Sequence, residues 1–182
     1  MIANEPEFLI GLAGVSATLL GAFVVGVFFY IDSEQHRHLT ASLAADLYLR
    51  AGVQWIFILL ALPLFVSLAL VSTETLYGAI IFIFFSVILV GSTVDTARRI
   101  LALMGPRPSM GVLINNWFSA AAVVAIVALP WIIGGWLPSA EAYMPSIILA
   151  LLAGFSSIAI LVIMQFDATM GMSQDDDRPR DK

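Results

Sequence analysis

The sequence predicts an all-α protein, a polytopic transmembrane bundle of five helices. The composition is 60% hydrophobic and only 12% charged, with a mean hydropathy of +0.98. A soluble domain is about half apolar and about a quarter charged, so this composition excludes that class. The chain of 182 residues also contains five long apolar stretches, and every Lys and Arg falls between or after alternate stretches. These observations predict one compact bundle that crosses the membrane five times.

The first predicted span covers about residues 8–31, which are 24 consecutive residues without Asp, Glu, Lys, Arg or His. As a helix this stretch is ~36 Å long, enough to cross a hydrocarbon core of ~30 Å. Glu5 and Glu7 precede it, where a secretory signal peptide carries positive charge. We therefore expect this helix to remain in the mature protein.

Small residues recur at helical spacing within the first span. Gly14, Thr18, Ala22 and Gly26 follow one another at every fourth position, and Gly21 belongs to the neighbouring row. Residues four apart lie on the same face of a helix, so this face carries little side-chain bulk and another helix can approach it closely. The sequence therefore predicts a helix-packing interface at Gly14, Thr18, Gly21, Ala22 and Gly26.

The second and third spans are predicted as a tight hairpin. Residues 32–50 form either a surface helix or an extension of the second span, which covers about residues 53–71 and which Pro63 bends. After a short turn, the third span covers about residues 76–94. We expect its helix to continue as far as Met104, before the helix-stopping pair Gly105-Pro106.

The last two spans are predicted at about residues 111–133 and 145–166. Between them, residues 134–143 are rich in Gly, Pro and Trp and indicate a loop, and Pro145 suits the first turn of the fifth helix. Residues 1–166 thus form the predicted five-span bundle. Residues 167–182 are polar and charged, and we expect a disordered cytosolic tail there.

The distribution of basic residues predicts the orientation. With five spans, one side receives residues 32–52, 95–110 and 167–182, which hold all eight Lys and Arg residues. Since cytosolic loops carry the excess of Lys and Arg, we expect the N-terminus outside and the C-terminus in the cytosol. A four-span or six-span topology would destroy this partition. The chain has no signal peptide and no glycosylation sequon, which fits a multi-pass protein of a bacterial inner (plasma) membrane.

Residues for catalysis or for cofactor binding are scarce in the predicted spans. The chain has no cysteine, and no predicted span contains Lys or His, so Schiff-base, haem and thiol chemistry are not expected there. Gly14–Thr18 resembles the nucleophile motif G-x-S-x-G except at its last position, and helix packing explains it better. His36 and His38 are two apart and favour a solvated loop over a metal site, with pH sensing as the alternative. We therefore expect no enzyme activity, metal, cofactor or nucleic-acid partner.

Four uncharged polar residues fall within the spans, near the predicted cytosolic third. Amides in a bilayer need partners, so these residues favour hydrogen bonds between helices, with a permeation or ligand site as the alternative. They are Gln54, Asn115, Asn116 and Ser119. Arg98, Arg99 and Arg107 are explained as determinants of topology and could also bind anionic lipid head groups.

Two functions remain compatible with the sequence. The favoured one is a non-enzymatic assembly or regulatory subunit that contacts another copy or another membrane protein through the small-residue face of the first span. The alternative is a homo-oligomeric ion or small-solute channel, whose pore small and amide residues would line. The absence of an acidic or basic ring in the spans disfavours the channel.

Overall fold

The computed structural model describes residues 5–32, 43–72, 75–103 and 110–176, which are helical except for a short loop at residues 135–139. Five helices each contain a segment long and apolar enough to span a membrane, as the sequence predicts. They are α1 (Glu5–Asp32), α3 (Leu43–Ser72), α4 (Thr75–Leu103), α5 (Met110–Gly134) and α6 (Ala140–Asp176).

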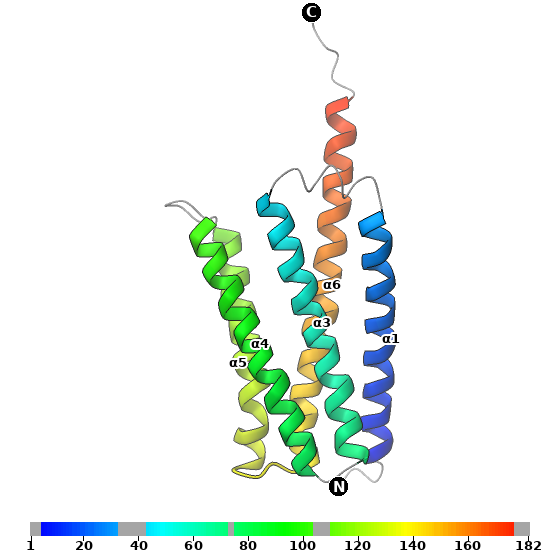
Figure 1. Cartoon of the computed structure of the whole chain (residues 1–182), viewed down its shortest axis with the longest axis vertical. Coiled ribbons are helices and arrows are strands. Elements are labelled where there is room, and N and C mark those ends of the chain that lie inside the picture. Colours follow the sequence, from blue (N-terminus) through cyan, green and yellow to red (C-terminus); the bar gives the residue numbers. More distant parts are fainter. Residues whose placement is uncertain (1–4, 33–42, 73–74, 104–109, 177–182) are drawn as a thin grey trace, which may run out of the picture.

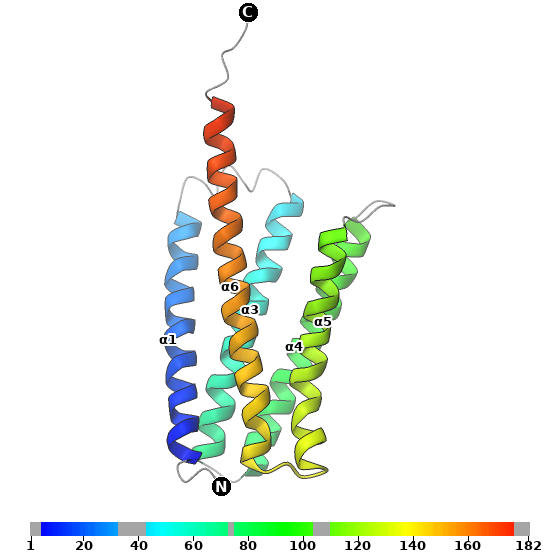
Figure 2. The ribbon, with the colours of Figure 1, turned by 180° about the vertical axis from the view of Figure 1, so that it is seen from behind.

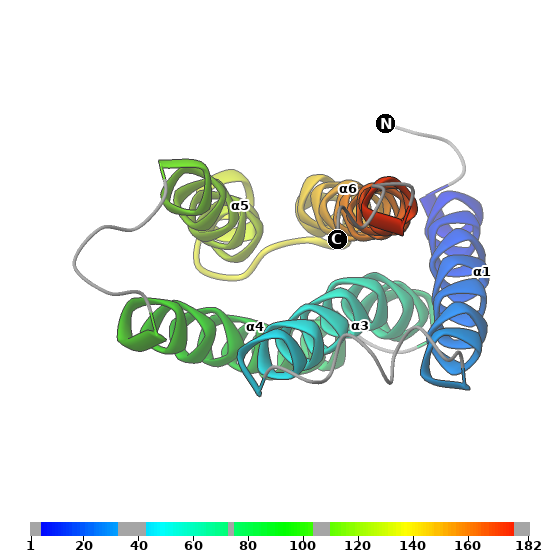
Figure 3. The same ribbon diagram turned by 90° about the horizontal axis from the view of Figure 1, so that it is seen from above.

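The helices stand side by side and cross the bundle in alternating directions (Figure 1). We call the end where α1 begins the Glu5 end, and the opposite end, where α4 carries Arg98, the Arg98 end. Seen along the bundle, α3 and α4 form one row and α5 and α6 a second, while α1 stands beside α3 and α6 (Figure 3). The closest packing joins α3 to α1, α4 and α6, and α5 to α6, whereas α4 and α5 contact each other less.

The helix α3 occupies the centre of the bundle. Within its membrane-spanning window 61% of the residues are buried, against 17–28% in the other four helices. Its residues Leu59, Leu62 and Val66 are fully buried in the main hydrophobic cluster, and Ile56 and Leu60 belong to a second cluster shared with α1 and α6. The other helices therefore leave broad apolar surfaces for lipid or for other membrane helices.

Aromatic side chains join α4, α5 and α6 near the Glu5 end. The ring of Phe82 lies 5.1 Å from that of Tyr143 and 5.6 Å from that of Trp131, measured between centroids. Trp131 and Tyr143 make an edge-to-face pair at 6.4 Å. Since such geometries are favourable for aromatic pairs, this trio holds α5 against α4 and α6 where the direct packing of α4 on α5 is sparse.

The connection from α5 to α6 is shorter than the sequence predicts. Gly135 has a positive φ of 70° and donates its backbone N–H to the carbonyl of Trp131 at 3.0 Å, which is the usual way for a glycine to close a helix. The helix α6 begins at Ala140, five residues before Pro145. Pro145 thus lies inside the helix, where its missing N–H affects only the carbonyl of Glu141 in the first turn.

At the Arg98 end, α3 and α6 are longer than their predicted spans. The helix α3 begins at Leu43, so residues 43–52 extend the second span. The helix α6 continues to Asp176, into the segment for which the sequence predicts disorder, and projects past the other helices (Figure 2). Residues 33–42, 104–109 and 177–182, including His36, His38 and Arg107, lie outside the described residues.

The contact of α3 with α6 depends on a glycine. A Cβ at Gly154 would lie 2.9 Å from Cδ2 of Leu60 and 3.5 Å from Cβ of Leu59. We expect Gly154→Leu to force the two helices apart and to lower the free energy of unfolding in detergent by about 1–3 kcal/mol. Gly91→Leu on α4 is the control, because a Cβ there meets nothing within 4 Å. Equal stability of the two variants would contradict this packing.

Candidate functional site

One side of α1 attaches this helix to the bundle. Leu9, Ala13, Ser16 and Phe23 are buried, and they follow one another at intervals of three, four or seven residues, which places them on one face. They pack against α3 and α6. Leu12, Leu19, Leu20 and Val27 flank these residues and are half-buried against the core clusters. The opposite side of α1 is exposed, so the helix has an attached side and a free side.

A hydrogen bond between helices lies in the middle of the attached side. The hydroxyl of Ser16, which is fully buried, donates to the backbone carbonyl of Leu60 on α3. Pro63 has no N–H to offer the carbonyl of Leu59, so the helical hydrogen bond of that carbonyl is missing in the turn that contains Leu60. The Ser16 hydroxyl thus bonds to the carbonyl next to the one that the proline leaves without its usual donor.

The five predicted interface residues lie on the free side of α1. Gly14, Thr18, Gly21, Ala22 and Gly26 are all exposed. A Cβ placed on Gly14, Gly21 or Gly26 would meet nothing within 4 Å. The structure therefore gathers these residues on one outer surface, which we call the small-residue face, and no helix of the same chain among the described residues covers it.

The small-residue face can bind a partner through its shallow shape, because its side chains present no free polar group. The only side-chain hydroxyl among its five residues, that of Thr18, donates to the carbonyl of Gly14 in the same helix at 2.9 Å. Larger side chains, including Val15 and Val25, are also exposed beside it. The result is an apolar surface of shallow relief, on which a second helix can lie with its backbone close to that of α1.

Of the four predicted intramembrane polar residues, the two whose side chains are described lie on different rows of helices. Gln54 is exposed on α3, and Ser119 is half-buried on α5, which belongs to the other row of helices (Figure 3). Asn115 and Asn116 lie on the first turns of α5, and their side chains are outside the described part of the structure. The prediction that these four residues bond between helices thus stays a prediction.

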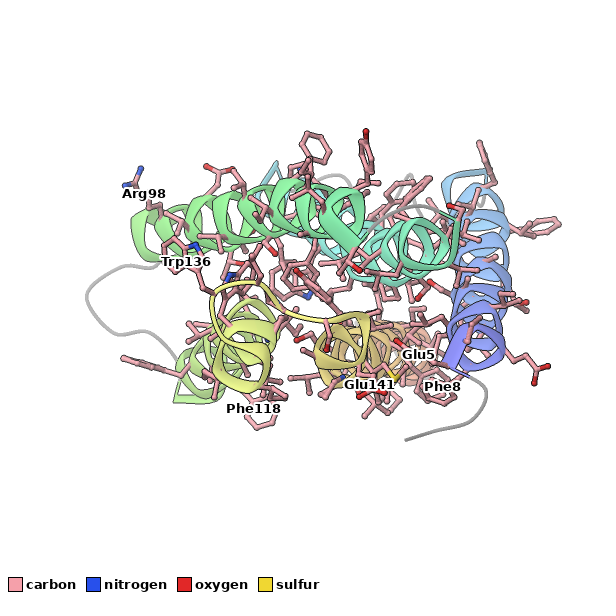
Figure 4. All side chains as sticks on the ribbon, turned by 90° about the horizontal axis from the view of Figure 1, so that it is seen from below. Glu5, Phe8, Arg98, Phe118, Trp136 and Glu141 are labelled. Atoms are coloured by element: carbon pink, nitrogen blue, oxygen red, sulfur yellow. The ribbon has the colours of Figure 1, made fainter. Side chains whose placement is uncertain are left out.

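Charged residues lie near the two ends of the bundle. Glu5 and Glu141 are at the beginnings of α1 and α6, as the view from the Glu5 end shows (Figure 4). Arg98 is exposed on the last part of α4, whereas the side chains of Arg99 and Arg107 are not described. Among the described residues, no group of three or more His, Asp or Glu could hold a metal ion.

Sequence reasoning missed the role of Ser16. Its neighbours Gly14 and Thr18 drew attention to the small-residue face, but Ser16 lies on the opposite side of the helix, in phase with Leu9, Ala13 and Phe23. This spacing could have been recognised in the sequence. One face of the span carries small residues and the opposite face carries Leu9, Ala13, Ser16 and Phe23, and two faces of different composition indicate two different contacts. The acceptor is a backbone carbonyl, which no side chain in the sequence marks. The nearby Pro63 is the one sequence feature that indicates irregular backbone hydrogen bonding there.

Removal of the Ser16 hydroxyl tests the attachment of α1 to α3. We expect Ser16→Ala to lower the free energy of unfolding by about 0.6 kcal/mol and by no more than about 1.7 kcal/mol, the mean and the maximum found for hydrogen bonds between membrane helices. Thr18→Ala is the matched control, because the Thr18 hydroxyl bonds only within its own helix. Denaturant titration in mild detergent measures both variants, and a Thr18→Ala loss as large as that of Ser16→Ala would contradict the assignment.

Comparison of the chain with protein-family models, with curated proteins and with solved structures found no match in any of the three. The candidate site is thus defined by geometry alone. That geometry consists of a helix attached to the bundle through one side and, on the other side, a surface of glycine, alanine and threonine.

Proposed function

We propose that this chain is a non-enzymatic integral membrane protein that acts as an assembly or regulatory subunit through the small-residue face of α1. The observation that carries the proposal is the exposure of this face: a Cβ on Gly11, Gly14, Gly21 or Gly26 meets no other atom within 4 Å. The partner is another membrane helix, from a second copy or from a different protein.

The contrast with other glycines supports an external partner. Gly78 and Gly154 are buried, and a Cβ on them would press against Leu70 and Leu60, so contacts within the chain account for these two glycines. A glycine inside a helix costs about 1 kcal/mol relative to alanine, and contacts among the described residues do not offset this cost for Gly14 and Gly21. Gly91 on α4 is equally open but stands alone, whereas α1 carries a row of small residues on one face. Close approach of a partner helix would explain such a row.

The charge distribution supports an orientation with the N-terminus outside and the C-terminus in the cytosol. Glu5, Glu7 and Glu141 lie at the Glu5 end, and Arg98 lies toward the opposite end. The other basic residues belong to segments that adjoin the Arg98 end or follow it. Short basic loops stay on the cytosolic side, so this polarity fits a bacterial inner membrane with the Arg98 end in the cytosol.

A bulky residue on the small-residue face tests the proposed assembly. We expect Gly14→Leu and Ala22→Leu to abolish crosslinking of the chain to its partner in membranes, because the added side chains hold the partner helix away. The thermal stability of the isolated chain should stay unchanged, since the space beside Gly14 is open. Gly91→Leu, on an exposed part of α4, is the control and should crosslink like wild type.

If Gly14→Leu crosslinks as well as wild type does, the small-residue face is not the interface. A symmetric oligomer of four or more copies that conducts ions or small solutes in liposomes would instead favour the homo-oligomeric channel. Loss of crosslinking in Gly14→Leu without any conductance supports the subunit function.

Single cysteines test the orientation, because the natural chain contains none. Ser139 is exposed in the loop before α6, at the Glu5 end, and Ser173 lies on the part of α6 that projects beyond the Arg98 end. With intact cells, an impermeant thiol reagent should label Ser139→Cys and leave Ser173→Cys unlabelled until the membrane is opened. The reverse pattern would overturn the orientation.

A further inference from the structure

The loop between α5 and α6 presents the two most exposed large apolar side chains among the described residues. Trp136 is 92% exposed and Leu137 is 79% exposed. Residues 132–140 include no Asp, Glu, Lys or Arg. Trp136 also lies apart from Glu5 and Glu141, on the α4 and α5 side of the bundle (Figure 4). The loop therefore forms an apolar projection at the Glu5 end.

Close packing fixes the backbone from which these two side chains project. A Cβ on Gly134 would lie 2.8 Å from Cβ of Pro138 and 2.9 Å from that of Ala142, so the end of α5 and the start of α6 are in tight contact. Pro138 is buried, and the backbone N–H of Ala142 donates to the carbonyl of Ser139 at 3.0 Å. The exposure of Trp136 thus belongs to a loop with a defined shape.

The loop lies at the boundary of the membrane-spanning segments. Apolar segments long enough to span a membrane end at Gly134 in α5 and begin at Ala140 in α6. Exposed aromatic side chains also occur near the beginnings of α1 and α4, at Phe8 and Tyr77. Phe29, which is exposed too, follows Phe8 after ~32 Å of helix, and a hydrocarbon core is ~30 Å thick. This spacing puts the Glu5 end at one boundary of the hydrocarbon core.

We propose that Trp136 and Leu137 anchor the α5–α6 loop in the lipid interface at the Glu5 end, where head groups meet acyl chains. An indole combines a large apolar surface with one N–H donor, and tryptophan is accordingly enriched at this level of a bilayer. The exposed side chains of Ile132 and Ile133 continue from the loop onto the outer surface of α5. The lipid that surrounds α5 therefore also reaches the loop.

The anchor stabilises the position of a helix that has few neighbours. The helix α5 packs closely only on α6, and 17% of its membrane-spanning window is buried. Interfacial tryptophan side chains help to set the tilt and rotation of such a helix. The loop belongs to the side of the bundle opposite α1, so the anchor does not depend on the small-residue face (Figure 3).

Spin labels on single cysteines test the anchor, because the natural chain contains no cysteine. Leu137→Cys is the test position, and Ser139→Cys, exposed in the same loop, is the matched control. Ile132→Cys, inside the spanning segment of α5, is the reference for lipid. In vesicles of phosphatidylcholine and phosphatidylglycerol, we expect labels at residues 137 and 132 to collide severalfold more with oxygen than with a water-soluble nickel chelate. The label at residue 139 should show the reverse.

Two results would overturn the proposal. Equal access of the nickel chelate to residues 137 and 139 would show that the whole loop lies in water. Low access of both oxygen and the chelate at residue 137 would show that protein, and not lipid, covers the loop.

Quenching of tryptophan fluorescence gives a second test without a label. Trp136→Phe should leave the bundle intact, because Trp136 is 92% exposed. We expect lipid that is brominated close to its head group to quench the wild-type protein, and the variant to lose a large part of this quenching. A variant that keeps the quenching by lipid and loses quenching by aqueous iodide would show that Trp136 faces water, which contradicts the anchor.

Discussion

The packing of α1, α4 and α6 on α3 is the constraint on which the rest of this structure depends. Lipid is as apolar as leucine, so burial of apolar surface does not by itself bring membrane helices together. Association relies instead on close approach and on hydrogen bonds between helices. The helix α3 provides both, because Leu60 packs against Gly154 of α6 and its carbonyl accepts the Ser16 hydroxyl of α1.

Pro63 lies three residues beyond Leu60, at which α1 and α6 contact α3. In a soluble helix a central proline is mainly a cost, since it removes a backbone hydrogen bond and bends the axis. In a bilayer the polar groups that it frees must find partners within the protein. The carbonyl that loses its N–H partner is that of Leu59, whereas the Ser16 hydroxyl donates to the next carbonyl, that of Leu60, so the proline and the bond between helices lie in the same turn of α3.

The sequence predicts the five helices because length and hydropathy decide them. The start of α6 is predicted less well than the helices themselves. Pro145 is compatible with several positions near the start of a helix, and the actual start, at Ala140, depends on the turn after Gly135. Hydropathy cannot predict which side of each helix faces inward, because the interior and the lipid are equally apolar. The exposure of Gly14 and the burial of Ser16 both had to come from the structure.

In the proposed assembly, α1 belongs to its own bundle through one side and contacts a partner helix through the other. Leu9, Ser16 and Phe23 fix the helix on α3 and α6. The small-residue face then has a defined position and direction, so the proposed partner helix would meet a surface that is already ordered. Binding to such a preformed surface avoids much of the entropic cost of ordering side chains, since glycine and alanine have no rotamers to lose.

Native mass spectrometry of the wild-type protein, extracted gently from its own membrane, tests the central claim most directly. The account predicts a particle that contains this chain with a second copy or with a different membrane protein, and a particle of one chain after Gly14→Leu. A wild-type chain that is released alone under conditions that keep known membrane complexes intact would contradict it.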